Sequence, residues 1–525
     1  MKKISLIILI NFILGLSGAQ ICDLTWNKPQ LSSNNSISFL QNDPDEDTLF
    51  AAELSRSPDS ESQFSFALSS CTSFKNAWKN FFSGQDTSSF LYYRTPDIPE
   101  IDSRFLTENK ISDNRFFASL LKLNLYSGFE HSWQEKGNYS FLYYGTRLSG
   151  FLTKRLFFSG HWWAGHFSGD LEQAANSPLI DSWFKYSKDN SRIYLDNVSG
   201  KISYRGKGDF WSLAAGRGKH EIGSNIGGSI ILNDDCNDYG YFSSKFVFPD
   251  FYVSYLHAAL IPDSTGFVTS LSFSDKFMVI HKFGWTPSSK FELFAGEEII
   301  YSNRSLDLDY MLPQLFWRAV EHNLGDRDNA LIFLGLNFRP QKFTLFYFNF
   351  ILDELRKAEI FSNWWGNKYA FQLGGSFTFH QERAGIVSLE FTAVRPWLYT
   401  HYILENKYSH YDISLGFPSG SNLLQYSCEL NYNIFSTVNF NLNALYKRQG
   451  SVGNSFNLNY NSRPSDQASW LAGKITDTLV LKPVLTWQML AYHRLKAGIL
   501  IQQEFGNGKE KVSDSEFYFS YQALY

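Results

Sequence analysis

The feature that most constrains the fold of this chain is a two-residue alternation of apolar and polar side chains over long stretches. In residues 424–434 one set of alternate positions is apolar, namely Leu424, Tyr426, Cys428, Leu430, Tyr432 and Ile434. The positions between them are polar, namely Gln425, Ser427, Glu429, Asn431 and Asn433. Successive side chains of a β-strand point to opposite faces of the sheet. The pattern therefore predicts a strand with one apolar and one polar face, and residues 438–447 repeat it.

The length of the predicted strands separates two all-β classes. Strands of about ten or more residues recur from Ala118 to the end of the sequence, which suits a tilted strand that crosses a membrane. Strands of soluble sandwiches average about half that length. No uninterrupted apolar stretch after Gln20 is long enough for a membrane-spanning helix. A closed barrel also pairs every backbone polar group within lipid, so residues 118–525 are predicted to form a transmembrane antiparallel β-barrel.

The connections between the predicted strands alternate between short and long. The short ones are predicted at 152–156, 205–209, 249–250, 287–290, 339–342, 380–384, 435–437 and 493–496. The long ones are predicted at 168–191, 218–237, 303–329, 353–366, 397–422 and 450–477. Outer-membrane barrels have tight periplasmic turns and longer extracellular loops. The segmentation gives about eighteen strands, an even number that puts both chain ends on the periplasmic side.

Aromatic residues support a membrane setting. The chain has 49 Phe, 29 Tyr and 14 Trp, and several of these lie beside the predicted short turns: Phe248, Phe251, Trp285, Phe291, Phe338, Phe343, Phe379 and Phe435. Amphipathic rings form girdles at the membrane interface, although cross-strand aromatic pairs also occur in soluble sheets. The final segment SEFYFSYQALY alternates and ends at Tyr525. We expect it to pair with the first strand, which removes the open edge.

The N-terminal part of the chain differs from the rest. Lys2 and Lys3, an apolar run over 4–16 and small residues at 17–19 predict a cleaved signal peptide over 1–19. Residues 20–117 are polar but contain CTSFKNAWKNFFSG, which has near-helical spacing. This region is predicted to be a small periplasmic or barrel-plugging element, with a disordered lead-in as the alternative. In the oxidising periplasm Cys22 could pair with Cys71.

Several functional classes find no support in the sequence. A net charge of −4 gives no basis for nucleic-acid binding. No spacing resembles a metal site, and no cofactor is expected. Glu297 and Glu298 are adjacent on a strand and point to opposite faces, while Asp307 and Asp309 belong to no recognisable catalytic set. We therefore expect a protein that is not an enzyme.

Two groups of residues are candidates for polysaccharide binding. The first lies in the glycine-rich segment 216–228 and comprises Arg217, Lys219, His220 and Glu221. The second lies in or near long loops and comprises Trp364, Trp365, Trp397 and Tyr399. Flat aromatic faces beside polar side chains suit sugar rings, whose C–H faces pack on aromatics while hydroxyls take hydrogen bonds. The alternative for the aromatic residues is the outer girdle of the barrel.

The central part of the chain resembles the capsule assembly Wzi family of outer-membrane proteins. The resemblance is carried by AGRGKHEIGSNIGGSIILND, by the Gly296-Glu297 strand end, by Tyr310 and Pro313, and by LFYFNFILDEL, over roughly residues 210–360. It implies an eighteen-stranded barrel with a small helical periplasmic element, acting as a surface lectin that attaches exported capsular or exopolysaccharide. The Glu221-Ile222-Gly223 step stands where a Trp-Gly step would be expected. Outer-membrane proteins also commonly end in an aromatic strand that the barrel-assembly machinery reads.

The expected partners are outer-membrane lipid, polysaccharide and the barrel-assembly machinery. A passive porin or nutrient channel is the main alternative, because a barrel of this size is wide enough to hold water. A surface barrel linked to gliding or adhesion is a further one.

Overall fold

The computed structural model describes residues 122–524, except 154, 178–186, 190, 263–274, 342–343, 361, 381–384, 491 and 507–508. The predicted signal peptide, the 20–117 region with its helix, the Cys22–Cys71 pair, Phe343 and Tyr525 all lie outside the described residues.

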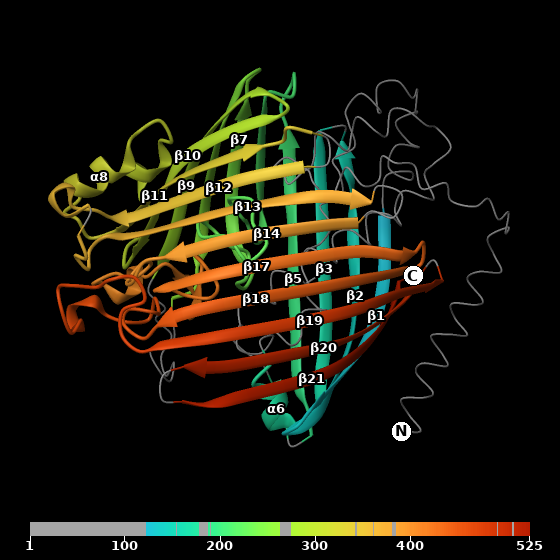
Figure 1. Cartoon of the computed structure of the whole chain (residues 1–525). Helices are drawn as coiled ribbons and strands as arrows, with labels where there is room; N and C mark the ends of the chain where they lie inside the picture. Colours follow the sequence, from blue (N-terminus) through green and yellow to red (C-terminus); the bar gives the residue numbers. More distant parts are fainter. Residues whose placement is uncertain are drawn as a thin grey trace.

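The described residues form a closed antiparallel β-barrel (Figure 1). They contribute nineteen strands to one sheet, of which the two-residue β4 (Ser187–Lys188) pairs only with β5 (Ile193–Arg205) and stands outside the ring. The other eighteen pair with their neighbours in sequence. β1 (Lys122–Gln134) and β21 (Lys509–Leu524) then close the ring, with Tyr126 opposite Leu524 and Gln134 opposite Glu516. The predicted all-β fold of about eighteen strands is confirmed.

The remaining ring strands have the following bounds: β2 (Gly137–Thr153), β3 (Leu156–Gly169), β6 (Trp211–Gly218), β7 (Tyr239–Val247), β8 (Phe251–Leu260), β9 (Lys276–Ser288), β10 (Phe291–Ser302), β11 (Asn329–Phe338), β12 (Thr344–Glu354), β13 (Lys368–His380), β14 (Gly385–Val394), β17 (Leu423–Phe435), β18 (Val438–Gly450), β19 (Ile475–Leu490) and β20 (His493–Gly506). Among the described residues, the connections hold two short α-helices, α6 (Leu171–Ala175) and α8 (Trp317–Asn323), and the two-stranded hairpin β15 (Ser409–His410) and β16 (Ile413–Ser414). They also hold the 3-10 turns η1 (Leu308–Met311), η2 (Lys357–Glu359), η4 (Leu404–Asn406) and η5 (Tyr460–Ser462). No helix among the described residues is both long and apolar enough to cross a membrane.

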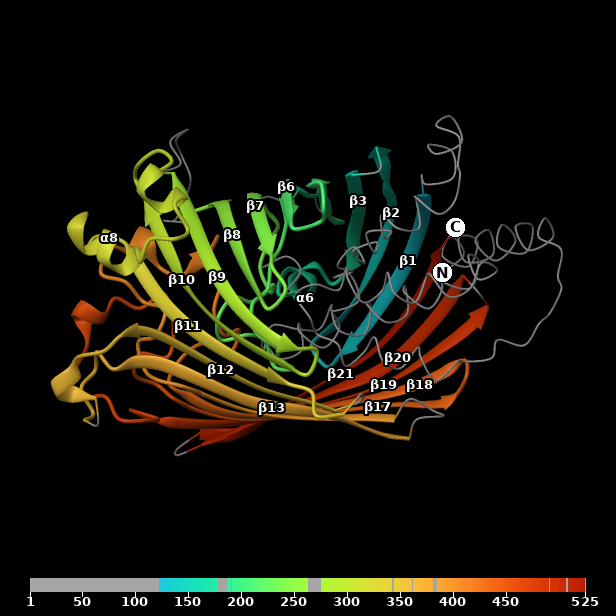
Figure 2. The same ribbon diagram turned by 90° about the horizontal axis from the view of Figure 1, so that it is seen from above.

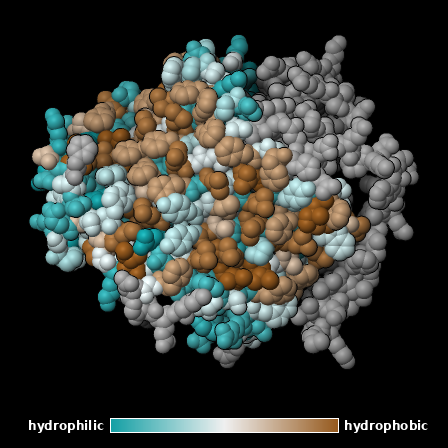
Figure 3. Space-filling model, viewed as in Figure 1, coloured by the Kyte–Doolittle hydropathy of each residue, from teal (hydrophilic) through white to brown (hydrophobic). Residues whose placement is uncertain are grey.

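The two faces of the strands follow the alternation in the sequence. On β17 the Tyr426 side chain is exposed on the outside, while Gln425 and Ser427 are buried and point inward. The inward amides and carboxylates bond to one another, as when Asn441 donates to Glu429 at 3.2 Å. Figure 3 shows the apolar band across the strands, with hydrophilic residues gathered at the end that carries the long loops. We call that end the loop end and the other the turn end.

The predicted connections are largely confirmed, with two differences. The last short turn precedes His493 rather than occupying 493–496, because β20 already begins at His493 and Lys496 is a buried, inward residue of that strand. His493 Nδ1 lies 2.6 Å from the Tyr521 hydroxyl. The alternation is also not strict: at the loop end β1 and β2 are joined by only Glu135 and Lys136, and β20 and β21 are close in sequence.

The predicted aromatic girdle lies at the turn end. The exposed fractions of the rings there range from 40% to 67%, in Phe248, Phe251, Trp285, Phe338, Phe379 and Phe435. Some of these rings pair, as Phe248 and Phe251 do with centroids 4.3 Å apart. Exposed rings beside tight turns are the arrangement expected of a membrane interface.

Candidate functional site

Residues 219–238, the plug segment, connect β6 to β7 and fold into the barrel (Figure 2). Apart from Asp235, every residue from Ser224 to Asp238 is buried. A buried loop must find partners for its backbone polar groups, so its contacts show what holds it.

The carboxylate of Glu390 on β14 is a central anchor of the plug segment. It accepts the backbone N–H of Ile226 at 2.8 Å, the N–H of Gly227 at 3.0 Å and the hydroxyl of Tyr347 at 2.6 Å. Hydrogen bonds to a carboxylate are stronger than those between neutral groups. Other inward side chains bind the same segment: Asn337 accepts from Ser224 Oγ at 2.8 Å, Asn349 donates to the Ser224 carbonyl at 2.8 Å, and Gln372 donates to the Gly228 carbonyl at 2.9 Å.

Residues 395–422, the inner loop, connect β14 to β17 and pack on the plug segment. The Tyr399 hydroxyl donates to the Ile230 carbonyl at 2.6 Å, and the Tyr408 hydroxyl donates to the Ile231 carbonyl at 3.0 Å. Tyr408 also contacts the carboxylate of Glu298, which points inward from β10. A buried apolar cluster shared by both segments and the strand wall surrounds these bonds, and includes Ile230, Ile231, Leu232, Leu256, Met278, Phe294, Leu398, Leu415 and Phe417. The two segments therefore form a folded core inside the barrel.

A group of aromatic side chains lies among the long loops at the loop end. This loop-end aromatic cluster comprises Trp364, Trp365, Trp397 and Tyr460. The ring centroids of Trp364 and Trp365 are 5.8 Å apart, and those of Trp365 and Tyr460 are 4.9 Å apart. Two loops meet here, since the Trp365 N–H donates to the Asp466 carbonyl at 3.0 Å.

Cationic side chains border the loop-end aromatic cluster. The guanidinium of Arg356 lies 4.4 Å from the centroid of Trp364, and that of Arg463 lies 4.1 Å from the centroid of Trp365. The ammonium of Lys368 lies 4.3 Å from the centroid of Tyr460. Cations at these distances are attracted to the ring faces. The result is a set of flat apolar faces interleaved with hydrogen-bond donors.

Arg395 joins the loops beneath the cluster. Its Nε donates to the Asn367 carbonyl at 3.1 Å and its Nη2 donates to the Ala468 carbonyl at 2.8 Å. Its guanidinium lies 5.3 Å from the centroid of Trp470. Burial lowers the pKa of Arg395 below its ordinary value. The arginine thus ties three loops into one unit.

Two histidines of the inner loop are kept neutral. Burial lowers the pKa of His401 to about 4 and the pKa of His410 to about 3. Lys276, whose ammonium donates to Ser409 Oγ at 3.0 Å, adds to the shift at His410. Removing a group from water disfavours its charged form, so both imidazole rings are neutral at any pH above these pKa values.

The structure places the first group of sequence candidates away from the second. Arg217 is exposed on β6, where its Nε donates to the Val198 carbonyl at 3.1 Å. His220, the second residue of the plug segment, packs on Tyr239 and Tyr241, while the Glu221 carboxylate accepts from Asn225 at 2.8 Å. Lys219 is partly buried beside them. This group lies at the entry of the plug segment.

The second group of candidates is brought together only in part. Trp364, Trp365 and Trp397 share the loop-end aromatic cluster, whereas the Tyr399 hydroxyl donates to the Ile230 carbonyl of the plug segment. Trp364 is partly exposed, but Trp397 and Tyr399 are buried, which gives them structural roles. Sugar contact by these residues stays a prediction.

Sequence reasoning missed the partners that complete the cluster. Tyr460 and Arg463 lie in the 451–474 loop, and Arg356 lies in the 355–367 loop, about a hundred residues away in sequence. The dense Asn, Ser and Pro content around Tyr460 predicted only a loop. Pairing of two loops depends on the order of strands around the ring, which no local pattern carries.

The acidic residues considered as catalytic candidates have structural partners. Glu298 points into the barrel, whereas Glu297 points outward and lies 3.0 Å from His281 Nε2. Asp307 pairs with Arg304 at 2.9 Å. The Asp307 carboxylate also accepts the backbone N–H of Asp309 at 3.1 Å and so caps a single 3-10 turn.

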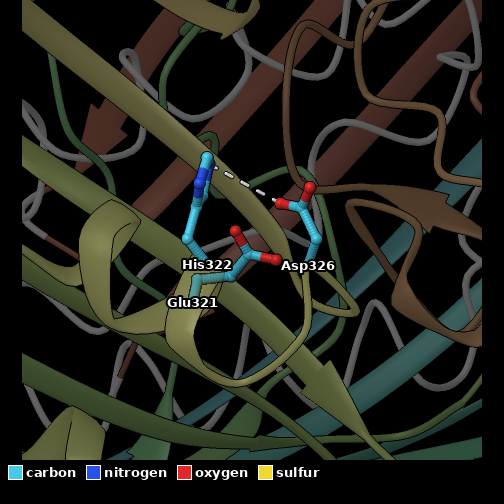
Figure 4. A group of neighbouring side chains, drawn as sticks. All are labelled: Glu321, His322 and Asp326. Carbon is cyan, nitrogen blue, oxygen red and sulfur yellow. Dashed lines mark ion pairs between the residues drawn. The ribbon is translucent and has the colours of Figure 1, made fainter.

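Glu321, His322 and Asp326 form a group whose ligand atoms are close enough to hold a metal ion (Figure 4). Arg318 Nη1 lies 2.5 Å from the Glu321 carboxylate and 3.4 Å from that of Asp326. His322 Nε2 lies 3.6 Å from Asp326. Since the guanidinium already compensates both carboxylates, the group is a weak candidate for a metal site.

Among the described residues, Cys236 and Cys428 are free thiols. Burial raises the pKa of the Cys236 thiol to about 12, so it is an inert apolar residue of the plug segment. Cys428 lies on the outward row of β17, as predicted.

Comparisons with known proteins concern the fold. No protein-family model matches the sequence, and no curated protein matches it. Among solved structures, the barrel is similar to Wzi of Escherichia coli, an outer membrane protein involved in group 1 capsule assembly and described as a carbohydrate-binding β-barrel. The identity is 13%, the match covers 86% of this chain and 97% of Wzi, and the TM-score is 0.49.

Two other solved barrels match at a similar level. OprD of Pseudomonas aeruginosa is 12% identical over 78% of this chain and 96% of its own, with a TM-score of 0.45. OccAB2 of Acinetobacter baumannii is 7% identical over 78% of this chain and 98% of its own, with a TM-score of 0.46.

Proposed function

We propose that this protein is an outer-membrane β-barrel that binds capsular or exopolysaccharide at its loop end and does not act as an enzyme. The membrane setting is supported by the outward apolar face of the closed ring and by the aromatic residues beside the turns. In this orientation the long loops are extracellular and both chain ends are periplasmic. The barrel-assembly machinery would insert the chain.

The single observation that carries the proposal is the folded core inside the barrel. The plug segment and the inner loop are held by Glu390, Tyr399 and Tyr408 and share a buried apolar cluster. A channel needs a continuous wet path, whereas an apolar cluster in the lumen obstructs one. Binding at the loop end is therefore favoured over passage.

The loop-end aromatic cluster supports polysaccharide as the ligand class. Trp364 and Tyr460 are partly exposed, and Arg356 and Lys368 lie over their faces. Sugar C–H faces pack on such rings, and the guanidinium of Arg356 suits glycans that carry carboxylates, whereas Lys368 is buried and pairs with Glu354 at 3.2 Å. The pairing of the loops through Arg395 holds these groups in place before binding, which lowers the entropic cost of association.

A glycan array on detergent-solubilised protein tests this proposal. We expect the double variant Trp364→Ala and Arg356→Ala to bind its best glycan about tenfold more weakly, because losing an aromatic face costs about 1 kcal/mol or more and 1.4 kcal/mol is tenfold in affinity. Trp162→Ala is the matched control, since Trp162 is a partly exposed tryptophan on the outer wall of β3. Equal binding by the wild type and the double variant would contradict the proposed site.

A passive channel is the second candidate function. It is favoured by part of the inward face of β1, β19, β20 and β21, which is polar and charged, with Glu130, Ser132, Lys482, Lys496 and Glu516. Such a wall suits a water-filled lumen. Solute uptake that falls in a deletion strain, while cell-associated polysaccharide is unchanged, would favour the channel. A strain that loses surface attachment or gliding with its polysaccharide intact would favour adhesion.

A further inference from the structure

Residues 303–328, the outer-wall segment, fold back over the outside of the barrel. They connect β10 to β11 and contain α8, which lies outside the ring (Figures 1 and 2). A buried cluster joins the segment to the wall and consists of Tyr255, Val279, Ile299, Tyr301, Tyr310, Trp317 and Ala330. The segment is thus part of the outer surface and not a free extracellular loop.

Besides this apolar cluster, the wall beneath the outer-wall segment carries polar groups. The Tyr255 hydroxyl lies 3.0 Å from His257 Nδ1, and His257 Nε2 lies 3.0 Å from the Tyr301 hydroxyl. His281 and Glu297 lie beside them, 3.0 Å apart, on the same outward face. In lipid these groups would be costly to expose, whereas in water they would need no cover.

The outer-wall segment is anchored to these polar groups. The Glu297 carboxylate accepts the N–H of Trp317 at 2.8 Å and the N–H of Arg318 at 3.0 Å, which satisfies the first amides of α8. The Trp317 ring stacks on His281 with centroids 4.0 Å apart. At the other end, the backbone N–H of Asp307 donates to the hydroxyl of Tyr301 on β10 at 3.2 Å. The segment therefore has a defined inner side.

The outer side of the same segment carries a run of exposed apolar side chains over 306–316, in which Asp309 and Gln314 are the exposed polar residues. Its exposed fractions range from 39% to 71%, in Leu306, Leu308, Met311, Leu312, Leu315 and Phe316. These side chains are close together in the sequence and none lies in the buried cluster on the wall. A covering segment that hides polar groups and presents leucines reverses the arrangement expected of a loop in water.

The position of the segment continues the apolar belt of the barrel. On β13 outward apolar residues extend from Tyr369 to Phe379, roughly 33 Å of strand at about 3.3 Å per residue. With a tilt of about 40° this spans about 25 Å along the membrane normal, the usual height of the belt. On β9 the next outward residue after the exposed Trp285 and Phe283 is the polar His281, so the bare belt there, measured in the same way, is only roughly 7 Å of strand.

We infer that the outer-wall segment is a membrane-embedded element whose apolar side contacts the acyl chains of the outer leaflet and completes the lipid-facing belt over β8–β11. This inference rests on the membrane setting of the proposed function, and not on the ligand bound at the loop end. Leu308 and Leu312 are the residues that contact lipid. The segment contributes surface that the wall itself lacks.

Spin labels at single cysteines test the inference in protein reconstituted into phosphatidylcholine liposomes. With Cys22, Cys71, Cys236 and Cys428 replaced, one label is placed at Leu308→Cys. A second is placed at Leu373→Cys, which is 55% exposed on the belt of β13, and a third at Asn461→Cys, which is exposed in a loop. We expect the ratio of oxygen to nickel-chelate accessibility at position 308 to match that at 373 and to exceed that at 461 several-fold. Leu312→Cys repeats the measurement should the first variant assemble poorly.

The outcomes separate the inference from the function on which it rests. Water accessibility at 308 and 312, with lipid accessibility at 373, would overturn the inference alone. Water accessibility at 373 as well would overturn the membrane setting itself. Water accessibility of 308 in liposomes, together with protection in native outer-membrane vesicles, would identify a protein partner and would also overturn the inference.

Discussion

At the scale of single residues, the interior of the barrel depends on buried polar groups that are paired with the plug segment. Glu390 accepts two backbone N–H groups and the Tyr347 hydroxyl, so its carboxyl group is hydrogen-bonded without a cationic partner. Buried carboxylates of this kind are stable only while every partner is present. The plug segment and the strand wall are therefore coupled through one side chain.

Replacing that side chain tests the coupling. Glu390→Gln keeps the shape but turns an amide group toward N–H donors, and leaving a buried donor unsatisfied costs about 1–3 kcal/mol. We expect amide hydrogen exchange at Ile226 and Gly227 to become about tenfold to a hundredfold faster. Glu429→Gln is the matched control, because Glu429 binds Asn441 and not the plug segment. Unchanged exchange in Glu390→Gln would show that the anchor is unimportant.

The neutral histidines of the inner loop give a second prediction, on pH. The pKa of His401 is about 4 and that of His410 about 3 in the folded protein, against an ordinary value near 6.5. The unfolded loop then binds more protons than the folded loop below pH 6.5, so stability is present above that pH and is lost as the pH falls toward 4. Lys276, Arg217 and Lys219 lie near His410 and oppose its protonation, while a hydrogen bond with the Asp238 backbone favours it.

Hydrogen exchange of residues 395–422 measures this pH effect. After correction for the intrinsic rate, we expect faster exchange at pH 5 than at pH 7.5, and a smaller difference in the double variant His401→Gln and His410→Gln. Exchange that does not depend on pH would contradict the buried neutral state of these side chains.

The residue-scale roles were only partly predictable from the sequence. Trp397 and Tyr399 are aromatic residues in a polar loop, and this pattern fits both an exposed sugar-binding surface and a buried support. Glu390 gave no signal at all, because an inward glutamate on an alternating strand resembles any other polar lumen residue. Which backbone it binds is decided by a loop that precedes it by about 160 residues.

At the scale of elements, the hairpins followed from the alternation and the loops did not. The strand bounds and most turns could be predicted because the side-chain period of two fixes which residues face lipid. The run from Ile230 to Leu232 within the 218–237 connection is the one local sign that this loop is buried. The outer-wall segment gave no comparable sign, since its leucines alternate with charges and it was predicted only as a long connection.

A charge placed in the apolar core should release the plug segment and leave the barrel intact. The Ile231 side chain is fully buried between the two inward segments, so Ile231→Asp would leave a charge there without a partner. We expect limited proteolysis from the extracellular side to cut residues 219–238 in this variant and not in the wild type. Leu404→Asp, on an exposed position of the inner loop, is the control. Resistance of Ile231→Asp to cleavage would contradict the packing described for the plug segment.

At the scale of the whole molecule, the closed ring explains why so much of the fold could be predicted. The chain crosses the membrane an even number of times, its last strand pairs with its first, and the outward face of the ring is apolar. Each of these three features has a local signature in the sequence. The loops that fill the ring have no such signature, because contacts between loops depend on the order of strands around the barrel. The polar wall of β1, β20 and β21 and the apolar core beside β8–β14 therefore emerged only from the structure.

The most direct test of the central claim, a barrel whose interior is obstructed by its own loops, is conductance in planar bilayers. Protein incorporation is verified first by flotation with liposomes of the same lipid. We predict that the wild type gives no steady large conductance and that Glu390→Gln and Ile231→Asp give openings. A steady, large, ohmic conductance from the wild-type protein would contradict the account.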